Sequence, residues 1–189
     1  MEPVLLVSCS PRRGGNSDYA VSLMERSMVV PFRSLRLADA GIRPCSSCLF
    51  CSCHPGKCVL DTPGDGAGEL FRAMGQAELC ILVSPIYFYH IPAQAKAWVD
   101  RAQRFWSCGE KPGKGGIMTA VLLAARTRGE KLFEGAERTF RFMAQTLGME
   151  WRAALTIYGV DGPNDLAANQ EACARIEEFA RKSLPRVLP

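Results

Sequence analysis

Short apolar runs alternate with longer amphipathic segments along the whole chain. Three of the five runs are almost continuously apolar, which is typical of strands that are covered on both faces. The longer segments repeat their apolar residues at helical spacing, so that Ile91, Ala95, Trp98 and Ala102, for example, share one face. The pattern predicts strands at 3–9, 32–38, 78–84, 116–124 and 154–160, and helices at 17–29, 64–76, 91–107, 130–148 and 165–183.

This alternation of strands and helices predicts an α/β fold. Parallel strands joined by right-handed crossover helices form a sheet with helices on both faces. We therefore expect a flavodoxin-like three-layer sandwich with a five-stranded parallel sheet. The length of 189 residues suits one domain, 1–189, and the segment at about 39–63, rich in Cys, Pro, Gly and Ser, is expected to be an irregular insertion in it.

Composition narrows the possible function classes. With 48% hydrophobic and 22% charged residues and a net charge of +4, the chain has average globular values, and no long basic run suggests a nucleic-acid partner. The apolar run near the N-terminus lacks a preceding basic segment, so it indicates a strand rather than a signal peptide. No apolar stretch approaches the roughly 20 residues that a membrane helix needs. We expect a cytoplasmic protein with neither membrane nor nucleic acid among its partners.

The sequence SCSPRRGGNS, residues 8–17, joins the first expected strand to the first expected helix. In sheets of this kind, ligands bind beyond the carboxyl ends of the strands. The segment offers hydroxyl groups, two arginines, two glycines that allow a tight turn, and the N-terminus of a helix, which favours an anion. It matches neither the P-loop nor the GxGxxG pattern. The segment therefore predicts a phosphate-binding loop of another kind.

A second motif, CSSCLFCSCHPGKC, places five of the nine cysteines within residues 45–58. In a reducing cytoplasm such a group indicates metal ligands or redox thiols rather than disulfides. Cys45, Cys48, Cys51 and Cys58 have the C-x2-C-x2-C-x6-C spacing that suits a cubane iron–sulfur cluster. A set with Cys53 in place of Cys51 is an alternative. A zinc site and unmetallated thiols also stay open.

Two segments of the chain resemble the flavin-binding segments of a known family. SCSPRRGGNS resembles the FMN phosphate loop of the NADPH-dependent FMN reductase family, and SPIYFYHIPAQAKAWVDR, residues 84–101, resembles its second flavin segment. The cysteine segment, followed by Asp61, is similar to the insertion of the iron–sulfur flavoprotein branch of that family. The resemblance covers about residues 3–125.

The resemblance implies which residues contact the flavin. It places the FMN phosphate at the first segment, the isoalloxazine and ribityl at the second, and a third flavin loop near 125–129. The implied phosphate ligands are Ser10, Arg12, Asn16 and Ser17, and the implied flavin-lining residues are Pro85, Ile86, Tyr87 and Phe88.

The expected function is that of an FMN-binding oxidoreductase that passes electrons between a 4Fe–4S cluster and FMN. The resemblance implies NAD(P)H as the electron donor. From the residues themselves, Arg126 or Arg128 is the candidate for binding a phosphate of that cofactor. A ferredoxin-fed electron carrier is one alternative, and a non-enzymatic, zinc-stapled interaction module is another. A homodimer or homotetramer is expected, because the flavin pocket needs apolar cover around a loop.

Overall fold

The computed structural model describes residues 3–129 and 131–184, and its centre is a five-stranded parallel sheet. The strand order, β2-β1-β3-β4-β5, is that of flavodoxin-like sheets, and the predicted fold class is confirmed. The strands are β1 (Val4–Ser8), β2 (Phe32–Arg36), β3 (Leu79–Pro85), β4 (Ile117–Leu123) and β5 (Glu150–Ile157).

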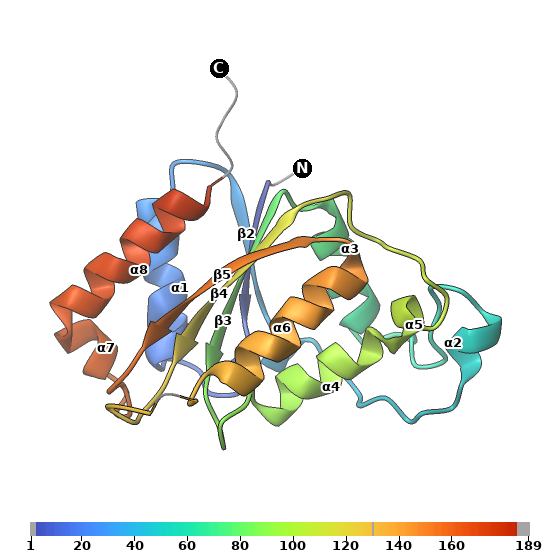
Figure 1. Ribbon diagram of the computed structural model, residues 1–189, viewed down its shortest axis with the longest axis horizontal. Helices are drawn as coiled ribbons and strands as arrows, with labels where there is room; N and C mark the ends of the chain where they lie inside the picture. Colours follow the sequence, from blue (N-terminus) through green and yellow to red (C-terminus); the bar gives the residue numbers. More distant parts are fainter. Residues whose placement is uncertain (1–2, 130, 185–189) are drawn as a thin grey trace.

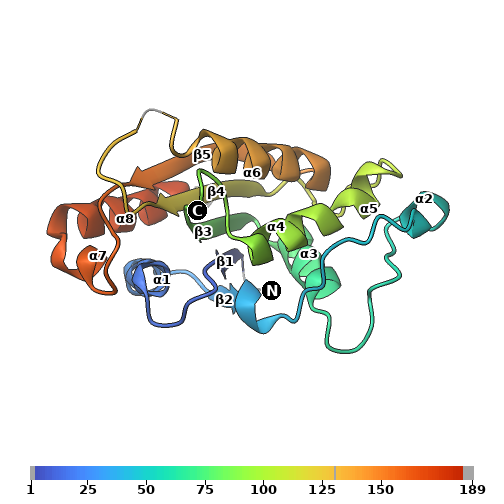
Figure 2. The same cartoon turned by 90° about the horizontal axis from the view of Figure 1, so that it is seen from below.

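Helices cover both faces of the sheet. Figures 1 and 2 show α1, α7 and α8 on one face and α3, α4 and α6 on the other. The helices are α1 (Asn16–Ser27), the 3-10 turn η1 (Leu37–Asp39), α2 (Phe50–Cys53), α3 (Ala67–Gln76), α4 (Ala93–Arg101), α5 (Gln103–Trp106), α6 (Glu134–Leu147), α7 (Asp165–Ala168) and α8 (Gln170–Ser183).

Each face of the sheet has its own hydrophobic core because side chains of a strand alternate between the two faces. In β1, Leu5 and Val7 pack toward α3 and α4, whereas Val4 and Leu6 pack toward α1 and α8. All four residues are buried, as the continuous apolar run predicts. None of the helices in the described part of the chain is long and apolar enough to cross a membrane.

Several element boundaries differ from the prediction. The last strand begins at Glu150 rather than at 154, because it is a half-exposed edge strand whose first residues lack an apolar pattern. The predicted helix 165–183 is divided at Asn169, whose side chain accepts the N–H of Ala172 and so starts a new helix. The predicted helix 91–107 is likewise divided, at Ala102. Residue 130, the expected start of the fourth helix, lies outside the described residues, and α6 begins at Glu134.

Two regions beyond the sheet matter for function. The carboxyl ends of the strands point toward the lower edge of Figure 1, where the loops that follow β1, β3 and β4 meet. The cysteine segment extends away from the sheet, and Figures 1 and 2 both show its short helix α2 beside α5.

Candidate functional site

A cavity of about 120 Å³ lies at the carboxyl edge of the sheet. It brings the loop after β1 together with the segment after β3, which are about 70 residues apart in the sequence. Of the eight residues predicted to contact FMN, all but Phe88 line it. The lining residues are Ser10, Arg12, Gly15, Asn16, Ser17, Pro85, Ile86, Tyr87, Leu123, Ala125, Val160 and Asp161.

The loop after β1 is held in place by hydrogen bonds to the side chains of Asp18 and Arg36. Gly14 adopts a left-handed conformation (φ 64°), and its N–H donates to the carboxylate of Asp18 over 2.8 Å. The other oxygen of Asp18 accepts the hydroxyl of Ser8, and Arg36 donates to the carbonyl of Arg12. Sequence reasoning missed Asp18 and Arg36 because their role depends on the folded loop and on the neighbouring strand β2.

Where the same loop lines the cavity, it carries backbone N–H groups that are available to a ligand. Within the described residues, the N–H groups of Gly15, Asn16 and Ser17 have no acceptor, as expected at a helix N-terminus. A Cβ on Gly15 would lie only 2.9 Å from Nε of Arg12, so the guanidinium lies beside Gly15, the N-cap residue of α1. The arrangement suits an anion such as a phosphate.

The two neighbouring arginines have different surroundings. Arg13 forms an exposed ion pair with Asp39, at 2.5 Å. Arg12 forms no ion pair with a carboxylate of residues 3–129 or 131–184, and it lines the cavity. Its positive charge is therefore free for a bound anion.

The side chain of Asn16 is already engaged. Its amide nitrogen donates to the carbonyl of Gly162 over 2.9 Å, and its amide oxygen accepts the N–H of Leu166 over 3.1 Å. These bonds tie the start of α1 to the loop that follows β5 and to α7. What Asn16 offers to a ligand is its backbone N–H, not the amide that its sequence position suggests.

The segment after β3 forms a tight turn from Tyr87 to His90. The N–H of Tyr87 donates to the carbonyl of His90, and the N–H of His90 donates back to Tyr87. Phe88 and Tyr89, at the centre of the turn, both have positive φ (48° and 63°), which is costly for residues other than glycine. The side chain of Phe88 is fully exposed and does not line the cavity.

The third loop reaches the same edge. Ala125 lines the cavity, and Arg126 donates to the hydroxyl of Tyr89 over 2.7 Å. Arg126, which the sequence suggested for a nicotinamide cofactor phosphate, is thus bound to the turn after β3.

The residues of this site fit FMN. An anion subsite of backbone donors and one free guanidinium lies next to the apolar surface of Pro85, Ile86 and Tyr87, and FMN likewise joins a phosphate to an apolar ring. The nearby thiol of Cys9 is no candidate nucleophile, because burial raises its pKa to about 12.

A second cavity, of about 340 Å³, lies in the cysteine segment. Cys45, Cys48, Cys51 and Cys58, the four residues of the favoured spacing, all line it, and Cys53 does not. Within the described residues, no three His, Cys, Asp or Glu side chains converge closely enough to hold a metal ion. Four thiol side chains around one cavity are nevertheless the donor set that an iron–sulfur cluster needs.

A buried network of charges joins this segment to the scaffold. Arg101, whose side chain is fully buried, donates to Asp61 (2.9 Å) and to Asp65 (2.8 Å). Burial alone would lower the pKa of Arg101, but its hydrogen bond to Asp65 raises it. Arg104 donates to both carboxylate oxygens of Asp61. Sequence reasoning singled out Asp61, but it missed Arg104 and Asp65.

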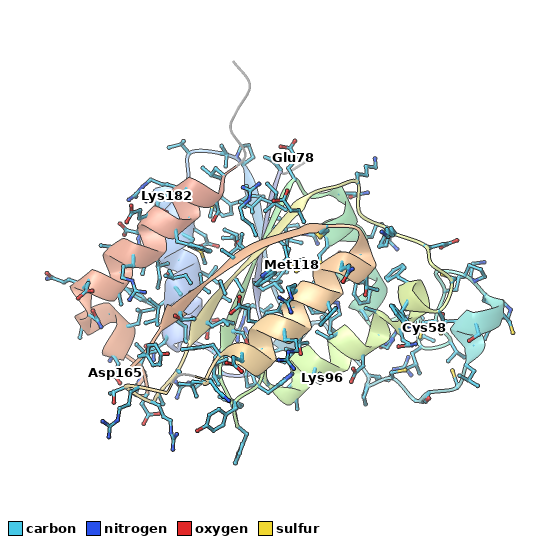
Figure 3. The ribbon with its side chains drawn as sticks, in the orientation of Figure 1. Cys58, Glu78, Lys96, Met118, Asp165 and Lys182 are labelled. Atoms are coloured by element: carbon cyan, nitrogen blue, oxygen red, sulfur yellow. The ribbon has the colours of Figure 1, made fainter. Side chains whose placement is uncertain are left out.

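The two cavities lie at opposite ends of α4. The turn after β3 precedes this helix, which is about 13 Å long at 1.5 Å per residue, and Arg101 at its end lines the second cavity. In Figure 3, Asp165, which holds the loop beside the first cavity, and Cys58, which lines the second, lie on either side of Lys96 of α4.

Comparison with solved structures supports the fold. An NAD(P)H:quinone oxidoreductase from Methanothermobacter marburgensis matches with a TM-score of 0.70, 16% identity and coverage of 96% of each chain. An FMN-dependent NADH-azoreductase from Bacillus anthracis, solved in complex with FMN, matches with a TM-score of 0.64 and 15% identity, over 95% of this chain and 98% of that one.

Curated relatives are more similar in sequence but are matched only in part. An iron–sulfur flavoprotein of Methanocaldococcus jannaschii is 34% identical over 53% of this chain and 51% of its own length. One from Archaeoglobus fulgidus is 31% identical over 49% of this chain and 41% of its own length. The chain thus spans about half the length of the curated relatives it matches.

The family model described as NADPH-dependent FMN reductase matches residues 3–149. That range includes β1 to β4, both segments that line the first cavity, and the whole cysteine segment. The chain belongs to the NADPH-dependent FMN reductase family.

Proposed function

We propose that the protein is an FMN-binding oxidoreductase of the iron–sulfur flavoprotein type. The observation that carries this proposal is the cavity at the carboxyl edge, where the guanidinium of Arg12 and the N-terminus of α1, both without a partner among the described residues, lie beside the segment after β3. Membership of the FMN reductase family supports the same conclusion.

In the proposed complex, Arg12 and the N–H groups of Gly15, Asn16 and Ser17 bind the phosphate of FMN. Pro85, Ile86 and Tyr87 cover part of the ring system and keep water from it. When bound, FMN supplies the redox chemistry by accepting a hydride or single electrons, while the protein positions it and sets its electrostatic surroundings.

The second part of the proposal is a 4Fe–4S cluster held by Cys45, Cys48, Cys51 and Cys58. These four residues line one cavity, and the similar curated proteins are named iron–sulfur flavoproteins. The exclusion of Cys53 from the cavity favours the set with Cys51 over the set with Cys53. Electrons would pass between the cluster and FMN.

NAD(P)H is the proposed electron donor, in keeping with the family, and a homodimer or homotetramer is the proposed assembly. The exposed aromatic turn at Tyr87 to Tyr89 supports an additional surface covering the flavin site. A ferredoxin-fed carrier on the same scaffold is the second candidate, because no second nucleotide-binding unit is recognisable in the sequence.

The decisive experiment is the visible spectrum of anaerobically purified protein, combined with iron and acid-labile sulfide analysis and with an FMN titration of the apoprotein. Stoichiometric FMN with about four irons and four sulfides per chain is the expected result. A colourless protein that takes up no FMN but holds stoichiometric zinc would instead identify a zinc-stapled interaction module.

Stopped-flow mixing then separates the two donors. We expect NADH or NADPH to bleach the flavin absorbance with a rate that saturates as the nucleotide concentration rises. Bleaching by reduced ferredoxin, with no reaction toward either nucleotide, would establish the carrier.

A further inference from the structure

The cysteine segment is closed at its base by one buried guanidinium. Arg101 donates to the backbone carbonyl of Arg43 over 3.0 Å and to the carboxylate of Asp61 over 2.9 Å. Arg43 lies two residues before Cys45, and Asp61 lies three residues after Cys58. Protein contacts alone therefore bring the two ends of the segment together.

Asp61 connects this guanidinium to one of the proposed ligands. Its carboxylate accepts the backbone N–H of Cys58 over 3.3 Å and is also held by Arg104, over 2.5 and 2.8 Å. A Cβ on Gly68 would lie 3.3 Å from Oδ1 of Asp61, so α3 leaves the carboxylate little room to move. The backbone of Cys58 is thus anchored to α4 and α5.

Arg101 itself forms part of the wall of the cysteine cavity. Arg101 and Cys58 line the same cavity, and the side chain of Arg101 is fully buried. Its Nε–H has no acceptor in the described part of the chain. A buried donor without a partner is unfavourable, and negative charge on the cysteine ligands would compensate it.

We infer that Arg101 and Asp61 are positioning residues of the cysteine site. They hold the segment closed, so that Cys45 and Cys58 face one cavity and less chain entropy is lost when a metal binds. They also place one positive and one negative charge beside Cys58. This inference rests on the metal site proposed above, and it assigns a function to an ion network that otherwise only stabilises the fold.

Cobalt binding tests the inference without any activity measurement. The full-length protein, loaded with FMN and freed of metal anaerobically, is titrated with Co²⁺ while the cobalt–thiolate absorption is followed. Asp61→Asn keeps the size of the side chain and leaves Arg101 its bond to Asp65, so the variant should fold. We expect its cobalt affinity to fall about ten- to a hundredfold, with unchanged FMN affinity.

Lys182→Gln is the matched control. It breaks an exposed ion pair with Glu178 on α8, which packs on the opposite face of the sheet. We expect this variant to bind both Co²⁺ and FMN as the wild type does. Urea unfolding of both variants shows whether they retain the fold.

The reduction potential of the reconstituted cluster separates positioning from a merely structural role. Asp61→Asn removes a negative charge near the cluster, which should raise the potential, because reduction adds an electron. Arg101→Lys keeps the positive charge but lacks the planar fork that reaches two acceptors, so it should weaken cobalt binding and leave the potential nearly unchanged.

Three outcomes would overturn the inference. If Asp61→Asn binds Co²⁺ as tightly as the wild type while Cys48→Ser loses it, the metal site stands and the positioning role fails. If cobalt affinity, FMN affinity and stability fall together and the potential does not move, the network is only structural. If the wild type binds FMN but no Co²⁺, the cysteine metal site itself fails, and the positioning role fails with it.

Discussion

The adjacent residues Arg12 and Arg13 differ in whether a carboxylate neutralises their charge. Arg13 is paired with Asp39, whereas Arg12 is unpaired among the described residues and lies beside Gly15, the N-cap residue of α1. Charge-assisted hydrogen bonds contribute about 1.5–3 kcal/mol, so Arg12→Ala should weaken FMN binding about ten- to a hundredfold. Titration of the apoprotein with FMN measures this effect.

Arg13→Ala is the control for that measurement. Because an exposed ion pair contributes at most about 1 kcal/mol, we expect this variant to lose about fivefold or less in FMN affinity. Equal losses in the two variants would show that only the net charge of the loop matters.

The five clustered cysteines are not equivalent, because four of them line the cysteine cavity and Cys53 does not. Cys48→Ser should abolish iron and sulfide incorporation while leaving FMN bound, because Cys48 lines the cysteine cavity and the phosphate loop lies elsewhere. Cys53→Ser should retain the cluster, since Cys53 lies outside that cavity. Iron and acid-labile sulfide analysis of anaerobic samples checks both. A cluster that survives Cys51→Ser but not Cys53→Ser would establish the alternative ligand set.

At the scale of elements, the turn after β3 carries backbone strain. Phe88 has a left-handed backbone, and its fully exposed side chain gains no burial in return. Asn favours this conformation, so Phe88→Asn should raise the free energy of unfolding by about 1 kcal/mol. Urea unfolding of the apoprotein measures the change.

A matched variant shows whether the effect belongs to the turn. Phe142 is also an exposed phenylalanine, but it lies within α6. Phe142→Asn should leave stability unchanged or lower it by a few tenths of a kcal/mol, because Asn has no advantage over Phe inside a helix. A similar gain from both substitutions would contradict the assignment of strain to the turn.

At the scale of the whole molecule, Asp65 links the cysteine segment to the sheet and helices. Burial alone would raise the pKa of Asp65, but hydrogen bonds from Arg101 and from the N–H groups of Arg43 and Ala67 hold it below its usual value. A carboxylate whose folded pKa is depressed stabilises the protein above its unfolded pKa. That contribution is lost as the pH falls through the folded value.

Asp65→Asn should therefore lower the free energy of unfolding by about 3–5 kcal/mol near neutral pH, because it breaks a buried ion pair. The difference from the wild type should narrow as the pH falls through the depressed pKa of folded Asp65, where the wild-type carboxylate also becomes neutral. Urea unfolding at a series of pH values tests this. A difference that does not change with pH would mean that packing, not charge, accounts for the loss.

Much of the fold was predictable because its signals are local. A continuous apolar run such as Val4 to Val7 indicates a buried strand, and alternation of strands and helices indicates a parallel sheet. The same locality made the phosphate loop recognisable, since hydroxyls, arginines, glycines and a helix start follow one another directly. The edge strand β5 was placed too late in the chain, because half-exposed residues carry no continuous apolar signal.

The sequence by itself determined the kinds of chemistry that this protein carries: a phosphate loop after the first strand, an aromatic turn after the third, and clustered thiols between them. Only the tertiary structure decided which groups are free to act. The side-chain amide of Asn16 is hydrogen-bonded to residues almost 150 positions away, and the guanidinium of Arg13 is paired with Asp39. Cys53 lies outside the cavity that four other cysteines share. Arg101 joins Arg43 to Asp61 across a loop. These outcomes depend on which distant segments meet when the chain folds, and the spacing of residues along the chain does not contain that information.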